Sequence, residues 1–591
     1  MFQSIKKVLA AYFKEMSFEP RIAELLPRNG GYTMPLFGKD VLAGVIVGVV
    51  ALPLSMAFSI SAGGTPAQGI YTAIMAGFFV SLLGGSKFQI AGPTGAFVTI
   101  IFGVQTRYGM DGLIMATILA GLMLLAMGLS GLGKFIKYIP HPVTMGFTTG
   151  IGLLIFSQQI KDLFALDIAA SSPEFFTKWA EYAGAFSTFQ WPSLALGLAT
   201  IAVIILMRRF APRIPGAAAA VAIATIVTAV FSLPVETIGS RYAGIPASLP
   251  IPALPALNWE IIRDVLPSAF TIALLAAIES LLSAVVADGM TGDRHNANME
   301  LVAQGLGNLA AGLFGGIPAT GAIARTATNI KNGAVSPVSG LVHVLTLVVF
   351  ILFLAPAASS IPLASLAGVL IVVSWDMSDI PRFVRLMRAS PKSDTIVLLT
   401  TFALTVTFDL TFAVEIGVIL AVFLFLRRVI EVAAIKPENN ELIAELAYGE
   451  IGKRTRNEIE ALSKDAVEIY EISGPFFFGV TDMLQTTLRT IPQNTRVIIL
   501  RMRDVPAVDA SGIAALETFM AQCKAKKITL MLSEIREQPL KALGKYGFID
   551  SLGVENVKDT LPKTLDAAED IVEGEGLLNR ATPPKPHVLT R

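Results

Sequence analysis

The sequence predicts a polytopic α-helical membrane protein with about 14 spans, followed by a small cytosolic α/β domain. Of its 591 residues, 53% are hydrophobic and 15% are charged, whereas soluble domains carry roughly 25% charged residues. Charge-poor stretches recur as far as Arg427, at lengths that suit membrane-crossing helices of about 20 residues. Beyond Arg428 charged residues become frequent and strand-like segments alternate with helical ones, which is typical of a soluble domain.

The chain divides into consecutive predicted parts. Residues 1–40 are expected to form a cytosolic segment with an amphipathic, Lys-bearing helix, and residues 41–430 the transmembrane domain. Its first two spans lie in Val41–Ser86, which contains no charged residue, and later spans are centred near residues 121, 150, 200 and 225. Residues 431–464 are rich in Glu, Lys and Asn and are predicted to be a linker. The α/β domain is expected over residues 465–570 and a flexible tail over residues 571–591.

Lysine and arginine gather in alternate loops of the predicted transmembrane domain. The opposite loops, 161–181 and 234–256, are acid-leaning or rich in proline. Because an excess of Lys and Arg marks cytosolic loops, both termini are predicted to be cytosolic. The basic residues concerned are Lys134, Lys137, Arg208, Arg209, Arg213, Arg382, Arg385, Arg388, Lys392, Arg427 and Arg428.

Two short segments indicate an internal repeat. Gly92–Phe97 and Pro318–Ile323 share the residues Thr-Gly-Ala followed by an apolar residue, at an offset of about 226 residues (Thr94 to Thr320). The same offset places the span that contains Glu279 over the first span, with Pro53 opposite Glu279. Seven spans in each half, an odd number, would give the halves opposite orientations, so inverted repeats are expected at about residues 41–235 and 264–430.

Each Thr-Gly-Ala segment follows a Gly- or Pro-containing break and is expected to restart a helix, near Thr94 and near Thr320. The N-terminus of a helix presents unpaired backbone N–H groups and the positive end of the helix dipole, which together bind anions. Small residues let an anion approach the backbone closely, although such residues also serve ordinary helix packing. The predicted anion-binding N–H groups belong to Gly95, Ala96, Phe97, Gly321, Ala322 and Ile323.

Glu279 lies in the middle of the apolar stretch that begins at Leu266. An ionisable residue at that depth costs several kcal/mol and is a functional candidate by default. Because burial opposes the charged form, Glu279 is predicted to carry a proton, with Ser283 one turn away in the same polar environment; the alternative is a structural carboxyl. Arg325 either adds positive field near the anion or forms an ion pair with Glu279, and the sequence favours neither.

Other functional classes find little support in the composition. A net charge of +1 gives no indication of nucleic-acid binding. The four histidines and the single cysteine are scattered, so neither a metal site nor a cofactor is expected. The sequence also lacks a recognisable nucleophile–base pair or phosphate-binding loop, so an enzyme is not expected.

These segments resemble the sulfate permease (SulP) family of anion transporters, whose members carry a C-terminal STAS domain. The similarity lies in Gly92–Thr94, the span around Glu279, the run Ala322–Asn329 and the loop Asp509–Gly512. It implies two inverted repeats, a core domain that moves against a gate domain, proton-coupled anion uptake and a homodimer in a bacterial inner membrane. In related STAS domains a serine at the position of Ser511 is phosphorylated, so Ser511 is a regulatory candidate.

Within that family, residues 277–308 are similar to bacterial DauA-type transporters, which implies C4-dicarboxylate substrates such as succinate, fumarate or aspartate. Sodium-coupled bicarbonate carriers have Asp and Thr where this chain has Glu279 and Ser283, and a hydroxyl residue in place of Ile323. Many sulfate carriers have Pro-Gln where this chain has Pro53-Leu54. Bicarbonate or sulfate transport, coupled to protons or sodium, and a passive anion channel remain alternative interpretations.

Overall fold

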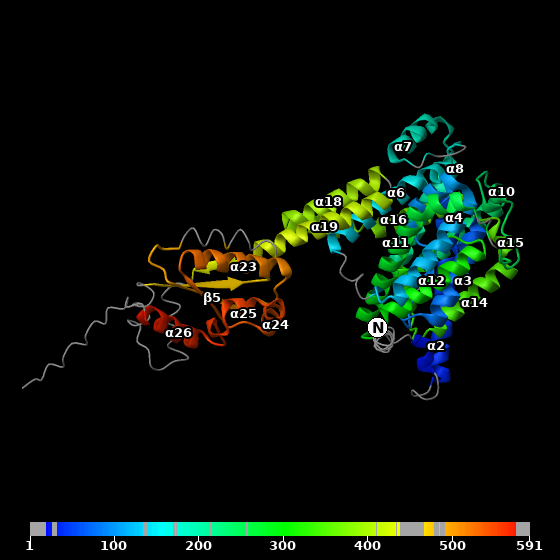
Figure 1. The fold of residues 1–591 in the computed structure, drawn as a ribbon. Helices are drawn as coiled ribbons and strands as arrows, with labels where there is room; N and C mark the ends of the chain where they lie inside the picture. The colour runs from blue at the N-terminus through cyan, green and yellow to red at the C-terminus, as the bar shows by residue number, and fades with distance from the viewer. Residues whose placement is uncertain are drawn as a thin grey trace, which may run out of the picture. The chain divides into compact units, whose positions relative to one another are not determined.

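A computed structural model describes residues 19–25, 32–133, 140–168, 174–211, 214–253, 258–408, 410–432, 434–437, 466–477 and 491–574, and the single residues 172, 255 and 484. The chain forms two units, Met1–Ala421 and Val422–Arg591 (Figure 1). The first is helical and the second contains a β-sheet. The predicted division into a helical part and an α/β part therefore agrees with the observed secondary structure.

One group of helices in the first unit comes from two distant parts of the chain. Helix α4 packs along α11 and α12, and α2 packs along α14 (Figure 1). Glycines allow the closest contact: a Cβ added at Gly121 of α4 would lie 2.8 Å from the carbonyl oxygen of Gly305 on α12. Such small-residue contacts are typical of helices in membranes. The group comprises α2 (Met34–Ser61), α3 (Pro66–Leu83), α4 (Gly95–Leu129), α11 (Trp259–Thr291), α12 (Ala297–Leu313), α13 (Ile323–Lys331) and α14 (Val338–Phe353).

A second group packs around α6, which contacts α16 and α18, while α8 contacts α9 and α16. The assignment of the two helix groups as core and gate domains stays a prediction. The second group comprises α6 (His141–Phe164), α8 (Trp191–Phe210), α9 (Gly216–Phe231), α16 (Leu363–Ser378), α18 (Lys392–Thr407) and α19 (Leu410–Val432). Short helices connect these elements: η1 (Arg21–Leu25), α7 (Phe175–Gly184), η3 (Phe186–Thr188), α10 (Ile238–Tyr242), α15 (Ala355–Ala358) and α17 (Ile380–Ala389).

Seven helices within the described residues are long and apolar enough to cross a membrane, and three apolar helices of 10–17 residues accompany them. Helix α4 contains a break at Gly109, where φ is 68°, so its two parts can be counted as separate segments. A count of about 14 spans, which includes such short and broken segments, stays a prediction.

Two very short strands connect the two halves of the first unit. Strand β1 (Ala91–Gly92) pairs antiparallel with β2 (Thr320–Gly321), so that Ala91 lies opposite Gly321. In addition, the backbone N–H of Ala322 donates to the carbonyl of Ile90 at 2.8 Å. The two segments that share the Thr-Gly-Ala motif are therefore side by side.

The second unit contains a five-stranded sheet in the order β3-β4-β5-β6-β7, in which β3 is antiparallel to β4 and the other neighbours are parallel. Its strands are β3 (Ala434–Pro437), β4 (Val467–Ser473), β5 (Val497–Asp504), β6 (Thr529–Ser533) and β7 (Val557–Lys558). Its helices are α23 (Ala510–Ala525), α24 (Glu537–Tyr546), α25 (Phe548–Leu552), α26 (Leu561–Gly574) and the turn η4 (Val554–Asn556).

The boundaries of the second unit differ from the predicted ones at both ends. Strand β3 lies inside residues 431–464, which the composition predicts to be a linker. Its pairing partner β4 begins about 30 residues later in the chain, so the local sequence does not indicate that this stretch forms a strand. Helix α26 continues to Gly574, beyond the predicted domain end at residue 570. Residues 478–483 and 485–490 of the predicted α/β domain lie outside the described residues, as does most of the predicted tail.

Candidate functional site

The two predicted half-helices begin at different positions within their motifs. Helix α4 begins at Gly95 with Thr94 as its N-cap, as the sequence predicts. Helix α13 begins at Ile323 with Ala322 as its N-cap, three residues after the predicted start near Thr320. The later start follows from the pairing of Thr320 and Gly321 with β1, which holds these two residues in an extended conformation.

This difference changes which backbone N–H groups can face an anion. The first three residues of a helix have N–H groups without an intrahelical acceptor. On α4 these include Gly95 and Ala96, whereas the N–H of Phe97 points back to the carbonyl of Thr94 at 3.3 Å. On α13 they belong to Ile323 and the two residues after it. Gly321 lies in β2, and Ala322 uses its N–H for the bond to Ile90, so these two are not helix-terminal donors.

Glu279 of α11 lies directly beside the N-cap of α4. Its Oε2 atom accepts a hydrogen bond from the Thr94 hydroxyl at 3.2 Å, and the side chain is half-buried. The sequence predicts Thr94 at the start of a helix but indicates no partner for its hydroxyl. A carboxyl that contacts the N-cap of a helix lies where the helix dipole favours negative charge.

The two segments that precede the half-helices (the lead-ins) are hydrogen-bonded to the backbone of α11 on either side of Glu279. The hydroxyl of Thr320 donates to the carbonyl of Ala276 at 2.9 Å, and the Gln89 side-chain amide donates to the carbonyl of Ser280 at 3.0 Å. Gln89 is buried and was not singled out from the sequence. The signal in the sequence is its polar amide, which lies among uncharged residues just before the segment Gly92–Phe97.

Ser283 belongs to a neighbouring network. Its hydroxyl donates to the hydroxyl of Thr326 at 3.1 Å, and Thr326 also accepts the backbone N–H of Ile90 at 3.1 Å. Ser283 therefore connects α11 to α13 and to the segment before β1.

Arg325 is buried, with 2% of its surface exposed, and its Nη2 atom donates to the carbonyl of Pro93 at 3.0 Å. Its side chain lies against Gly92, where an added Cβ would be 2.6 Å from Nη1. Among the ion pairs of the described residues, none joins Arg325 to Glu279. The guanidinium of Arg325 therefore lies beside Pro93, just before the N-cap of α4, and its role toward an anion stays a prediction.

A pocket opens on one side of Glu279 and is mainly apolar. Its polar lining consists of Glu279 and two threonines of α6, and Ile323, the first residue of α13, exposes 41% of its surface. The lining comes from both helix groups, which is where a site for alternating access would lie. The lining residues are Val143, Thr144, Phe147, Thr148, Leu275, Ile278, Glu279, Leu282, Ile323 and Val418.

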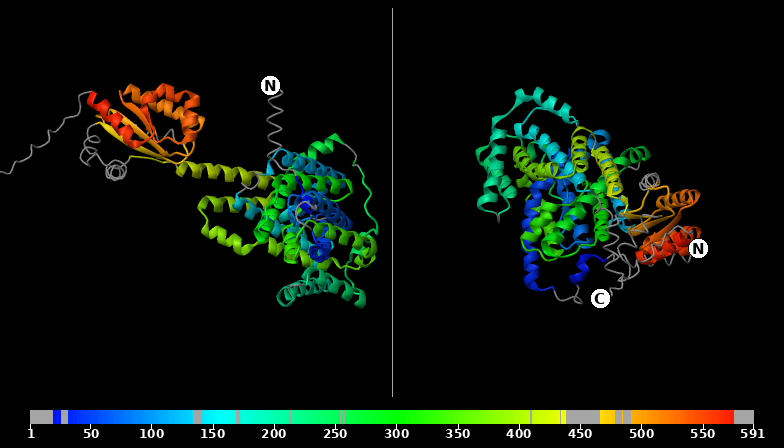
Figure 2. Two further views of the ribbon diagram at one scale, coloured as in Figure 1. Left: turned by 90° about the horizontal axis from the view of Figure 1, so that it is seen from below. Right: turned by 90° about the vertical axis from the view of Figure 1, so that its left-hand side faces the viewer.

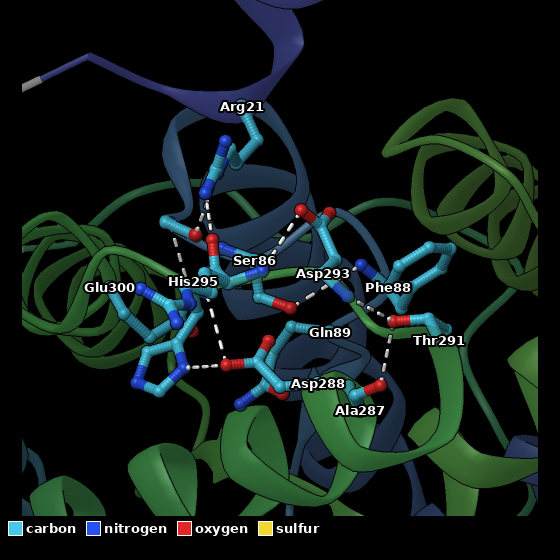
Figure 3. Close-up of polar contacts among 12 residues, drawn as sticks. Arg21, Ser86, Phe88, Gln89, Ala287, Asp288, Thr291, Asp293, His295 and Glu300 are labelled. Carbon is cyan, nitrogen blue, oxygen red and sulfur yellow. Dashed lines mark hydrogen bonds and ion pairs between the residues drawn. The ribbon is translucent and has the colours of Figure 1, made fainter.

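A separate polar cluster surrounds the loop between α11 and α12 (Figure 3). Lys87 forms ion pairs with Glu24 of η1 at 2.8 Å and with Asp293 at 3.1 Å, and His295 contacts Asp288 at 2.7 Å. Burial opposes the charge of Lys87, but its hydrogen bonds to Glu24 and Asp293 raise its pKa above the usual value. This cluster attaches η1 to the end of the first helix group and does not reach Glu279.

In the second unit, Ser511 is exposed in the first turn of α23. The N-cap of this helix is Asp509, whose side chain accepts the N–H of Gly512 at 2.8 Å. An added phosphate at Ser511 would lie at a helix N-terminus, where negative charge is favourable. A regulatory role for Ser511 stays a prediction.

Comparisons with known proteins give consistent results. The model of the sulfate permease family matches residues 37–401, and the model of the STAS domain matches residues 458–564. The "Putative sulfate transporter YvdB" of Bacillus subtilis is 42% identical over 534 residues, which cover 90% of this chain and 98% of that protein. The bicarbonate transporter BicA of Synechocystis is 32% identical and is matched over 86% of its length by 82% of this chain.

Two solved structures are similar to this fold. The transmembrane domain of a cyanobacterial bicarbonate transporter BicA has 30% sequence identity and a TM-score of 0.58, and the match covers 66% of this chain and 98% of that one. The structure of SLC26A9 has a TM-score of 0.81 with 18% identity and covers 97% of this chain and 95% of that one. The second match shows a common fold and no more.

Proposed function

Because the chain belongs to the sulfate permease family of membrane anion transporters, we propose that it couples anion uptake to protons by alternating access, with Glu279 as the proton carrier. The family assignment makes the protein a transporter embedded in the membrane and not an enzyme. The proton, the identity of the anion and the roles of individual residues belong to the proposal.

The hydrogen bond between Thr94 and Glu279 is the observation that carries this proposal. It places an ionisable carboxyl at the N-terminus of one half-helix, and β1–β2 pairing brings the other half-helix beside it. An anion at these N-termini would sit close to the carboxyl, and like charges oppose each other, so anion binding would favour the protonated carboxyl. Binding of the anion and binding of the proton would then each increase the affinity for the other, and this reciprocal linkage would couple anion uptake to the proton.

We propose a C4-dicarboxylate as the first candidate substrate. The pocket beside Glu279 is mainly apolar, which suits an anion whose carboxylates are joined by a hydrocarbon chain better than it suits a fully polar oxyanion. Sulfate and bicarbonate are the second candidates, because the related proteins carry those names. Uptake of labelled succinate, sulfate and bicarbonate into proteoliposomes, each with the other two as competitors, decides between them.

The proton-carrier role predicts a specific defect for Glu279→Gln. Glutamine has the shape of the protonated carboxyl but cannot release a proton, so the variant should exchange internal for external substrate while losing accumulation driven by a proton gradient. Both reactions are measured in the same proteoliposomes. Accumulation equal to that of the wild type would make Glu279 a structural residue.

The assembly and topology are further parts of the proposal. We expect a homodimer, as the similarity to the family implies, and cytosolic termini, as the Lys and Arg distribution predicts. Cross-linking in native membranes followed by mass measurement tests the dimer, and labelling of single cysteines from either side of the membrane tests the orientation. Cys523, the only native cysteine, is buried.

A further inference from the structure

Helix α7 carries a lysine that is almost completely buried. Lys178 exposes 3% of its surface and lies on a short helix outside the predicted membrane spans. Figure 2 shows α7 at the periphery of the first unit in both views. Lysine is rarely buried to this extent without a partner of opposite charge, because removal of its charge from water is unfavourable.

Within the described residues no carboxylate forms an ion pair with this ammonium group, and the electrostatic attraction of Glu181, three residues along α7, offsets the effect of burial only in part. Among the described residues no ion pair or hydrogen bond of the Lys178 ammonium group occurs, and its contact is with the ring of Phe102, 5.2 Å from the ring centroid. The nearest acid on the same helix, Glu181, accepts the backbone N–H of Ser172 at 2.9 Å. Burial lowers the pKa of Lys178 to about 8, so the group remains mostly protonated at neutral pH.

The contact joins the two helix groups. Helix α7 is attached to the second group, because Trp179 donates its indole N–H to Ser157 of α6 at 3.2 Å and α7 also contacts α18. Phe102 belongs to α4, seven residues after Gly95, and is therefore about 10 Å along the helix from the proposed anion site. The pocket beside Glu279 includes Val143 and Thr144 at the start of α6, whereas α7 follows the end of α6.

We propose that Lys178 is an anion-binding residue of the outer entrance, which rests on the Phe102 ring while that entrance is closed and binds the incoming anion when α4 moves away from α7. The inference rests on the proposed alternating access. It adds an outer binding step on the face that the Lys and Arg distribution predicts to be external. A cation–π contact is weak, so an incoming anion can replace the ring as the partner of the ammonium group.

The test compares Lys178→Met with Lys178→Arg in the full-length protein. Right-side-out membrane vesicles report the KM for an external anion, and everted vesicles report the KM from the other face. Labelled succinate, sulfate and bicarbonate are the probes. Loss of the charge in Lys178→Met should raise the external KM about fivefold and leave the internal KM unchanged, since a solvent-exposed ion pair contributes up to about this much to binding. Lys178→Arg should stay close to the wild type.

Lys161→Met provides a matched control on the same face. Lys161 donates to the carbonyl of Ile168, and within the described residues the cation over the Phe102 ring is Lys178, so removal of Lys161 tests the general effect of one positive charge. Thermal stability gives an independent readout. Because an unpaired buried charge is unfavourable, Lys178→Met should unfold at the same or a higher temperature than the wild type. If the role of Lys178 were purely structural, the substitution would lower the unfolding temperature.

The outcomes separate this inference from the proposed function. A wild type that takes up none of the three anions would contradict the proposed function itself. Uptake by the wild type with an unchanged external KM in Lys178→Met, or with equal changes on both faces, would overturn the outer binding step alone. A lower unfolding temperature with unchanged KM would assign Lys178 a structural role.

Discussion

At the residue scale, the site depends on a small number of side-chain contacts around Glu279. The Thr94 hydroxyl contacts the carboxyl, while Thr320 and Gln89 hold the two lead-ins to the backbone of α11 on either side of it. Ser283 and Arg325, which the sequence groups with Glu279, have other partners: Thr326 for the serine and the Pro93 carbonyl for the arginine. The carboxyl is therefore coupled most directly to the N-cap of α4.

Thr94→Val tests this contact, because valine keeps the shape of threonine and removes the hydroxyl. We expect proton-driven uptake to fall about five- to tenfold, the effect of losing one hydrogen bond to an ionisable group worth roughly 1 kcal/mol. Initial uptake rates in proteoliposomes measure this loss, and Thr94→Ser should restore most of it.

Thr99→Val is the matched control on the same helix. The Thr99 hydroxyl is buried in α4 and has no hydrogen-bond partner within the described structure, so its removal should change the rate less than about twofold. Equal losses in Thr94→Val and Thr99→Val would mean that α4 tolerates neither change for reasons of packing and that the contact to Glu279 has no special role.

At the scale of elements, the pairing of β1 with β2 is the feature that assembles the site. It holds two segments from opposite halves of the chain together, and Arg325 adds a hydrogen bond from α13 to the residue that follows β1. The guanidinium requires Gly92 at this point, since an added Cβ would lie 2.6 Å from Nη1 and 3.3 Å from the Cβ of Ala73.

Gly92→Ala should therefore displace Arg325 or separate the two strands. Overpacking of this kind destabilises proteins by about 1–3 kcal/mol, and transport should fall by at least about tenfold because the half-helices lose their alignment. Uptake per amount of folded protein is the measurement. Gly103→Ala, on the same helix group with open space around it, should behave like the wild type. Normal uptake by Gly92→Ala would show that Arg325 is free to move.

At the scale of the whole molecule, the chain consists of a membrane-embedded unit and a second unit with its own hydrophobic core. The core of the second unit lies on both faces of its sheet, with Phe519 and Leu543 on one face and Leu565 and Ala568 on the other. Ile435 of β3 packs against the first of these faces. The sheet thus includes a strand that precedes the predicted domain start at residue 465.

We expect a fragment of residues 434–574 to fold by itself and to unfold cooperatively in urea, as monitored by circular dichroism. A fragment of residues 465–574 lacks β3 and leaves the edge of β4 unpaired, so it should be less stable by at least about 1 kcal/mol and more prone to aggregate. Equal midpoints for the two fragments would mean that β3 contributes nothing to the domain.

Removal of the whole domain from the full chain should lower expression or transport rate without changing which anion is transported.

The sequence by itself determined the membrane location, the division into two parts and the positions of Glu279 and the two Thr-Gly-Ala segments. These features are local: a charge-free run predicts burial in lipid whatever it packs against, and a carboxyl inside such a run is conspicuous for the same reason. The internal match also indicated that residues about 226 positions apart are equivalent (Thr94 and Thr320).

Only the tertiary structure decided which of these residues meet. Helix α13 begins at Ile323 because β2 pairs with β1, so Gly321 and Ala322 do not act as helix-terminal donors. Strand β3 exists because β4 lies beside it, although the composition of that stretch is typical of a linker. The hydrogen-bond partner of a residue depends on which distant segment packs beside it, and the sequence pattern of one segment does not specify that neighbour.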